Sequence, residues 1–183
     1  MNRIARQMTT MAIALLALAW GGFAAAASKA EINAGVDATL QAFYAQHTGN
    51  LELVNKAAAV LVFPHVTKAG LGVGGEHGEG ALWIGGKVKK YYSVNGASIG
   101  ATLGVAEHSE IILFMTADAL KSFERSKGWT IGADAGVAVA SKGAGVAYDN
   151  QTLLRPVLSF VMDEKGLIGD LSLAGAKVTP IVG

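Results

Sequence analysis

The sequence predicts an α+β domain in which N-terminal helices pack on a large, curved, barrel-like antiparallel β-sheet. Three observations lead to this class. Helical spacing of apolar residues is confined mainly to the stretch before residue 60. Beyond it, apolar residues alternate with small or polar ones, which is the period of a strand. Turn-forming residues separate these short segments, as is typical of antiparallel sheets that curve or close.

Two helices are predicted before the sheet, over residues 29–46 and 51–59. The first has an apolar stripe at helical spacing, formed by Ile32, Val36, Leu40 and Phe43. Its polar face lacks the lysines and arginines expected at anionic lipid, so packing on the sheet is favoured over insertion into a membrane. A later short helix is predicted from Thr116, whose hydroxyl can cap it, to Phe123.

A glycine-rich strand is the most unusual stretch. Gly70, Gly72 and Gly74 alternate with apolar residues, so one face of this strand carries no side chains. Such a face lets another backbone lie very close. The polar segment Glu76–Gly80 is predicted to be the turn that pairs Gly70–Gly75 with residues 81–86. Gly70, Gly72 and Gly75 also form G-x-G-x-x-G, but a dinucleotide site needs that motif to open a helix, and here a strand continues.

Further strands are predicted along the rest of the chain. Small residues alternate with apolar ones again over residues 98–106 and 131–140, which predicts a strand in each segment. Lys87–Lys90 and Asn95-Gly96 are predicted to be turns, the latter being a favoured hairpin dipeptide. The remaining predicted strands are residues 91–94, 110–115, 143–148, 153–162, 167–173 and 176–181.

Several short motifs resemble the signature of one known family. In the first part of the chain they are Phe63-Pro64, Lys68-Ala69-Gly70, Gly72-Val73-Gly74-Gly75 and Gly78-Glu79-Gly80. Later ones are Phe114-Met115-Thr116, Ala119-Leu120, Phe123, Gly128-Trp129 and Gly166-Leu167. Together they resemble the SYLF domain, also called the Ysc-type actin-binding domain. The resemblance implies a non-catalytic binding domain, because eukaryotic members bind phosphoinositide membranes and in some cases actin. It also implies export, which is typical of bacterial members.

Residues 1–27 have the pattern of a secretory signal peptide, and residues 28–183 are predicted to form a single SYLF-like domain. Arg3 and Arg6 precede a short apolar run, and small residues before Ser28 form a cleavage pattern. The apolar run is short for a transmembrane helix, although an uncleaved anchor is the alternative. We expect cleavage near Ala27-Ser28 and a periplasmic or secreted protein, associated with membranes only peripherally.

Composition excludes several functions. The chain has no cysteine, which excludes disulfides, thiolate catalysis and cysteine-based zinc sites. The formal charge is +1, and it becomes −1 without the two arginines of the signal peptide, so nucleic acid is not an expected partner. No Ser-His-Asp arrangement of a hydrolase can be argued from the sequence alone. We therefore expect no enzyme activity and no cofactor, and a hydrolase or metal-dependent enzyme is the less favoured alternative.

A basic and aromatic cluster is the best binding candidate. Lysines attract lipid headgroups, and aromatic rings suit the membrane interface. The alternative is a solvated hairpin end that its lysines protect from edge-to-edge pairing. The candidate lipid-binding residues are Lys68, Trp83, Lys87, Lys89, Lys90, Tyr91 and Tyr92.

Two other sites are weaker candidates. Asp134 interrupts an apolar strand and could line a polar pocket, although it could also face solvent or bond to backbone donors. Glu76, His77 and Glu79 could contribute to a metal site with a distant histidine, but their spacing is not diagnostic, and no metal is predicted.

These observations favour a non-catalytic, exported protein that binds lipid. The expected partner is an anionic phospholipid or membrane surface. The alternative is a structural or protein-interaction module of the cell envelope that binds another envelope protein.

Overall fold

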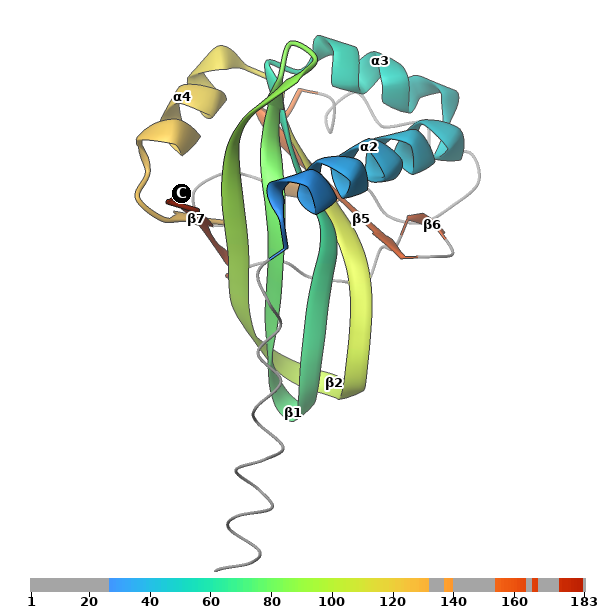
Figure 1. Ribbon diagram of the computed structural model, residues 1–183, viewed down its shortest axis with the longest axis vertical. Coiled ribbons are helices and arrows are strands. Elements are labelled where there is room, and N and C mark those ends of the chain that lie inside the picture. The colour runs from blue at the N-terminus through green and yellow to red at the C-terminus, as the bar shows by residue number, and fades with distance from the viewer. Residues whose placement is uncertain (1–26, 132–136, 140–153, 164–165, 168–174, 183) are drawn as a thin grey trace, which may run out of the picture.

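The computed structural model describes residues 27–131, 137–139, 154–163, 166–167 and 175–182 (Figure 1). Its helices are α2 (Lys29–Gln46), α3 (Thr48–Lys56) and α4 (Ala117–Arg125). Its strands are β1 (Ala59–Ile84), β2 (Lys87–Phe114), β3 (Trp129–Thr130), β4 (Val137–Val139), β5 (Val157–Asp163), β6 (Gly166–Leu167) and β7 (Lys177–Pro180). The described strands form one seven-stranded, strongly curved sheet with the N-terminal helices on it, which confirms the predicted fold class.

The strands are ordered β3-β7-β2-β5-β4, with β1 also paired to β2 and β6 to β5. The pairings are antiparallel except for that of β4 with β5, which is parallel. Ser109 adds a side-chain link between β2 and β5, since its hydroxyl donates to the Met162 carbonyl at 3.4 Å. Strand β2 therefore binds three other strands along its length.

The two longest strands, β1 and β2, form one hairpin. Gly85 and Gly86 make its two-residue turn with φ of 57° and 82°, the conformation that a type I′ turn requires and glycine adopts freely. The prediction that Glu76–Gly80 is the turn was wrong: these residues lie within β1 and pair with residues 92–96 of β2. Asn95-Gly96 and Lys87–Lys90 are likewise strand residues of β2 and not turns.

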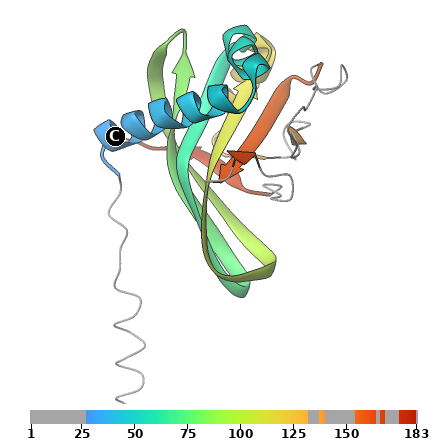
Figure 2. The same cartoon turned by 90° about the vertical axis from the view of Figure 1, so that its right-hand side faces the viewer.

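This hairpin bends back on itself halfway along (Figures 1 and 2). The pairing shifts where Leu71 faces Leu103 but Val73 faces Ile99, so β2 has extra residues at the bend. We call residues 59–70 with 103–114 the first arm, and residues 74–84 with 87–98 the second arm. The bend and the Gly85–Gly86 turn lie at opposite ends of the folded hairpin.

Glycines let the two arms of the hairpin approach closely. A Cβ on Gly78 would lie 2.7 Å from the carbonyl oxygen of His65, and one on Gly80 would collide with the carbonyl oxygen of Val62. In the bend, a Cβ on Gly70 would lie 2.7 Å from the Cα of Gly74. The predicted close approach of another backbone to the glycine face is therefore confirmed, and that backbone belongs to the same strand.

The curved sheet has a buried cluster on each face. The outer cluster lies under α2 and α3, and the two helices contribute Ile32, Val36, Leu40, Phe43, Leu53 and Val54 to it. The inner cluster is closed by α4 and by Trp129. The ring centroid of Phe123 in α4 lies 4.8 Å from that of Phe114, with the rings tilted, and 5.5 Å from that of Trp129, with the rings edge-on. Side-chain alternation along β1 and β2 therefore decides which residues enter each cluster.

Local capping explains where the helices begin. The Ser28 hydroxyl accepts from the Glu31 backbone N–H, and the Glu31 carboxylate accepts from that of Ser28, which is a capping box. Helix α2 matches its prediction. Helix α3 starts earlier than predicted, because the His47 side chain caps it by accepting from the N–H of Gly49. The expected Thr116 cap of α4 is confirmed by its bond to the Ala119 N–H.

The C-terminal strands are only partly described. β5, β6 and β7 lie within the predicted segments 153–162, 167–173 and 176–181 or overlap their ends. The predicted strand 143–148 and most of 131–140 lie outside the described residues, and so does the candidate pocket residue Asp134.

Replacing Gly80 by alanine tests the close approach of the arms. The added methyl group would meet backbone atoms of Val62, which cannot rotate away, so we expect a loss of about 1–3 kcal/mol in unfolding free energy. Gly75→Ala is the matched control, because the nearest atom to its Cβ is the Gly96 carbonyl oxygen at an ordinary 3.6 Å. Urea unfolding of both variants measures the difference, and equal stability would contradict the close packing.

Candidate functional site

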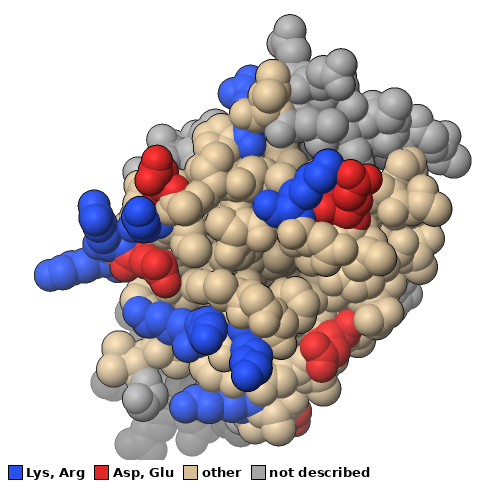
Figure 3. Space-filling view, turned by 90° about the horizontal axis from the view of Figure 1, so that it is seen from above, with Lys and Arg blue, Asp and Glu red and all other residues tan. Residues whose placement is uncertain are grey.

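Three of the predicted lipid-binding lysines surround the Gly85–Gly86 turn. Lys87, Lys89 and Lys90 are exposed, and within the described residues none of them has an acidic partner within ion-pair distance. Figure 3 views the molecule from this end and shows basic side chains crowding one side, with acidic ones between some of them. The turn therefore presents to solvent three lysines that have no ion-pair partner in the described part of the chain.

Helix α2 adds a fourth lysine that the sequence analysis missed. The Lys29 ammonium lies 5.6 Å from the centroid of the Tyr91 ring, and the Tyr91 hydroxyl donates to the Asn33 side chain at 3.0 Å. Tyr91 is thus held between the helix and the sheet, half-buried. The signal for Lys29 was absent from local sequence, because only the docking of α2 on the sheet brings residue 29 beside residue 91.

Tyr92 and Trp83 are not exposed rings. Tyr92 is 3% exposed and packs 4.9 Å from Phe123 in the inner cluster. Burial, with a further contribution from the charge of Glu124, raises the pKa of Tyr92 to about 12. The Lys90 ammonium lies 5.6 Å from the Tyr92 ring centroid. Trp83 packs half-buried on the outer cluster. Both rings therefore pack against the protein instead of projecting into solvent.

The structure does not bring Lys68 to this turn. Lys68 is half-buried and faces Ala106, close to the bend at the far end of the hairpin. There its charge acts on two buried groups, Glu76 and His108. We call Lys29, Lys87, Lys89 and Lys90 the basic turn, and Lys68 is excluded from it.

A second polar site lies inside the folded hairpin, and the sequence analysis missed it as a site. Glu76 of the second arm is buried, and so are three polar residues of the first arm and of β5: His108, Glu110 and Ser159. The charge of Glu76 acts on Glu110. Glu110 is 0% exposed, and neither of its carboxyl oxygens has a hydrogen-bond partner among the described residues. The sequence did give one indication of this site. Glu110 lies on the same face of β2 as the buried residues Ile112 and Phe114, because every second residue of a strand points to the same side.

Burial controls the protonation of these groups. It raises the pKa of Glu110 to about 8, and the charge of Glu76 adds to this, while the nearby Ser159 hydroxyl opposes it without forming a hydrogen bond of good geometry. Burial also raises the pKa of Glu76, against the effect of Lys68. For His108, burial and then Lys68 lower the pKa to about 4, against Glu107. At neutral pH the interior therefore holds a protonated Glu110 and a neutral His108.

This arrangement provides a buried proton and no metal centre. In the residues the structure describes, no group of three histidines and carboxylates converges to hold a metal ion. Glu76 and His77 are neighbours on a strand and point to opposite faces, and His77 Nδ1 instead lies 2.7 Å from the side-chain oxygen of Asn95. The alternative metal site of Glu76, His77 and Glu79 is therefore not formed in the described structure.

The curved sheet, the exposed basic turn and the sealed polar interior define a β-rich domain with one basic end. Residues 95–181 match the Ysc84 family, described as Las17-binding protein actin regulator. This segment runs from the second arm to just beyond β7, and the match agrees with the SYLF resemblance that the motifs indicated. The match supports a binding module of the lipid- or actin-binding type. No curated protein matches the chain. Among the described helices, none is long and apolar enough to cross a membrane.

The buried carboxyls predict a loss of stability in mild alkali. Glu110 ionises in the unfolded chain above about pH 4.5 but in the folded protein only near 8, so unfolding releases a proton between these values and rising pH favours it. His108 has the opposite effect, but only below its ordinary pKa of 6.5. We therefore expect Tm to fall from pH 6.5 to 8.5.

Glu110→Gln tests the origin of this slope by calorimetry. Glutamine keeps the size of the neutral acid but cannot ionise, so its Tm should be nearly constant across the same pH range. Asp118→Asn, whose carboxylate is exposed on α4, is the control and should retain the wild-type slope. A wild-type slope in Glu110→Gln would contradict the assignment.

Proposed function

We propose that this protein is a non-catalytic, exported lipid-binding protein that docks on anionic phospholipid surfaces through its basic turn. The match of residues 95–181 to the Ysc84 family supports a lipid- or actin-binding module. The basic turn supports the choice of an anionic surface. A protein-interaction module of the cell envelope is the alternative, and vesicle binding distinguishes the two.

The observation that carries the proposal is the gathering of four lysines from two distant segments. Lys29 of α2 lies over the ring of the half-buried Tyr91, and the exposed Lys87, Lys89 and Lys90 of β2 follow the turn. Each lysine near an anionic surface contributes about 1 kcal/mol. Four of them give weak, reversible binding that should be sensitive to salt, because exposed charges are screened beyond about 8 Å at physiological ionic strength.

The beginning of the folded domain supports export. Ser28, the expected first mature residue, is the N-cap of α2, and the helix needs nothing before it for its capping box. Cleavage after Ala27 would leave that box intact. After cleavage the Ser28 nitrogen would be the N-terminal ammonium. This nitrogen now donates to the Glu31 carboxylate at 2.7 Å, and a positive charge on it would strengthen that contact.

Replacing Lys87, Lys89 and Lys90 by glutamine should remove most binding to phosphatidylglycerol-containing vesicles at low salt. Co-sedimentation measures it, and the domain should stay folded because exposed lysines contribute little to stability. The matched control changes Lys56, Lys121 and Lys127 to glutamine, which removes the same charge elsewhere. Equal loss in both variants would show dependence on net charge alone. If the wild-type protein does not bind vesicles with or without phosphatidylglycerol, the protein-interaction alternative is favoured.

The export proposal predicts a mature chain that starts at Ser28. N-terminal sequencing of protein recovered from the periplasm or medium checks this. Recovery of a chain that still carries Met1 from that fraction would contradict cleavage.

A further inference from the structure

The bent end of the β1–β2 hairpin is uncharged over both strands. We call residues 69–75 of β1 and 97–106 of β2 the hairpin tip. Neither segment contains a lysine, arginine, histidine, aspartate or glutamate. Figures 1 and 2 both show the bent end projecting beyond the helices, at the opposite end from the Gly85–Gly86 turn.

Apolar side chains on this tip face solvent. Val73 is 72% exposed and Val105 is 77% exposed, and the neighbouring Ala69, Ala97 and Ala106 are exposed as well. Exposed valines on a glycine-rich, uncharged projection form a surface without an internal partner in the described protein. Apolar side chains exposed together on an uncharged projection are one mark of an interaction site.

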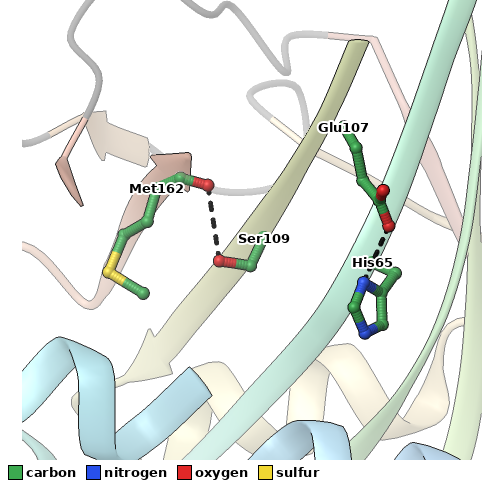
Figure 4. A network of polar contacts seen from close by, with 4 residues as sticks. All are labelled: His65, Glu107, Ser109 and Met162. Atoms are coloured by element: carbon green, nitrogen blue, oxygen red, sulfur yellow. Dashed lines mark hydrogen bonds and ion pairs between the residues drawn. The ribbon is translucent and has the colours of Figure 1, made fainter. Parts of the chain in front are cut away.

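A polar band borders the tip on the same outer face. His65 Nδ1 of β1 pairs with the Glu107 carboxylate of β2 at 2.7 Å, which Figure 4 shows across the two strands. In the second arm, His77 and Asn95 are paired side by side on their strands. The change from apolar to polar therefore occurs at the same level on both arms.

We propose that the hairpin tip inserts into the interfacial layer of a lipid bilayer, with the His65–Glu107 and His77–Asn95 pairs at the headgroups. From Ala69 to the middle of the bend is about three residues at about 3.3 Å each, or ~10 Å. This length matches the about 5–10 Å to which interfacial elements bury their apolar faces. The partner is a lipid surface, as in the proposed function. The contact is made by the hairpin tip instead of the basic turn, and it is driven by burial of apolar side chains instead of charge attraction.

The shape and size of the tip favour a bilayer over a second protein. A standard protein interface uses about 20–30 residues on each side, more than the tip contains on all its faces together. The tip is also convex, whereas small-molecule sites are concave. A bilayer accepts a convex apolar projection without shape complementarity. Insertion stops at the interface because strand edges cannot satisfy their backbone groups in the hydrocarbon core.

The absence of cysteine allows a direct test in the full mature chain. Val73→Cys carries an environment-sensitive fluorophore at the tip, and Lys87→Cys carries it at the basic turn as the comparison. Vesicles are either pure phosphatidylcholine or phosphatidylcholine with phosphatidylglycerol, at low and high salt. We expect the tip probe to shift to the blue and to be quenched by brominated acyl chains, with the shift persisting at high salt.

The outcomes separate this inference from the proposed function. A shift of the Lys87 probe alone would overturn tip insertion while supporting docking through the basic turn. A shift of the tip probe alone supports insertion and contradicts that docking. Shifts of both probes support both surfaces. No shift of either probe and no co-sedimentation would overturn both proposals.

Charged substitutions at the tip give an independent measurement. Val73→Asp with Val105→Asp should reduce salt-resistant vesicle binding at least about tenfold, because a carboxylate is strongly disfavoured in the apolar layer. The matched control, Leu154→Asp with Val182→Asp, adds the same charge at side chains that are 83% and 96% exposed away from the tip. Both variants should keep the wild-type Tm, since all four side chains face solvent. Equal binding by the two variants would overturn insertion.

Discussion

The close approach of the two arms of the β1–β2 hairpin is the constraint on which the rest of the structure depends. Gly78 and Gly80 put backbone against backbone where any side chain would meet a carbonyl oxygen of the first arm. Because one long hairpin is folded back, a single pair of strands supplies both walls of the inner cluster. The same folding places the basic turn at one end of the molecule and the uncharged tip at the other.

Bringing the arms together has an electrostatic cost inside the hairpin. Glu76 belongs to the second arm and Glu110 to the first, so their carboxyls lose water when the arms close. Two buried carboxylates would repel each other, and retaining a proton on Glu110 removes most of that repulsion. Lys68, half-buried near the bend, favours the ionised form of Glu76. Closure is thus compatible with these acids as long as the interior keeps its proton.

The sequence predicted local features well and tertiary ones poorly. The apolar stripe of α2, the cap at Thr116 and the bare face of the glycine strand depend on near neighbours. The turn at Glu76–Gly80 was wrong because its polar residues resemble a loop, whereas Glu76 fits inside the fold against Gly96. The basic turn lacked Lys29 and wrongly included Lys68, since both positions depend on how distant segments pack.

The glycine pattern has different consequences along the same strand. At Gly78 and Gly80 the missing side chains permit burial, and the outward neighbours Glu79 and His77 are polar. Around the bend, Gly70 and Gly74 again permit close approach, but the outward neighbours Ala69 and Val73 are apolar and exposed. The bend constrains the glycine positions but not the residues on the outer face, so polar residues there would be compatible with it. The apolar outer face of the tip is therefore unexplained by folding, and contact with an apolar phase is the physical setting in which exposed valines there would be stabilising.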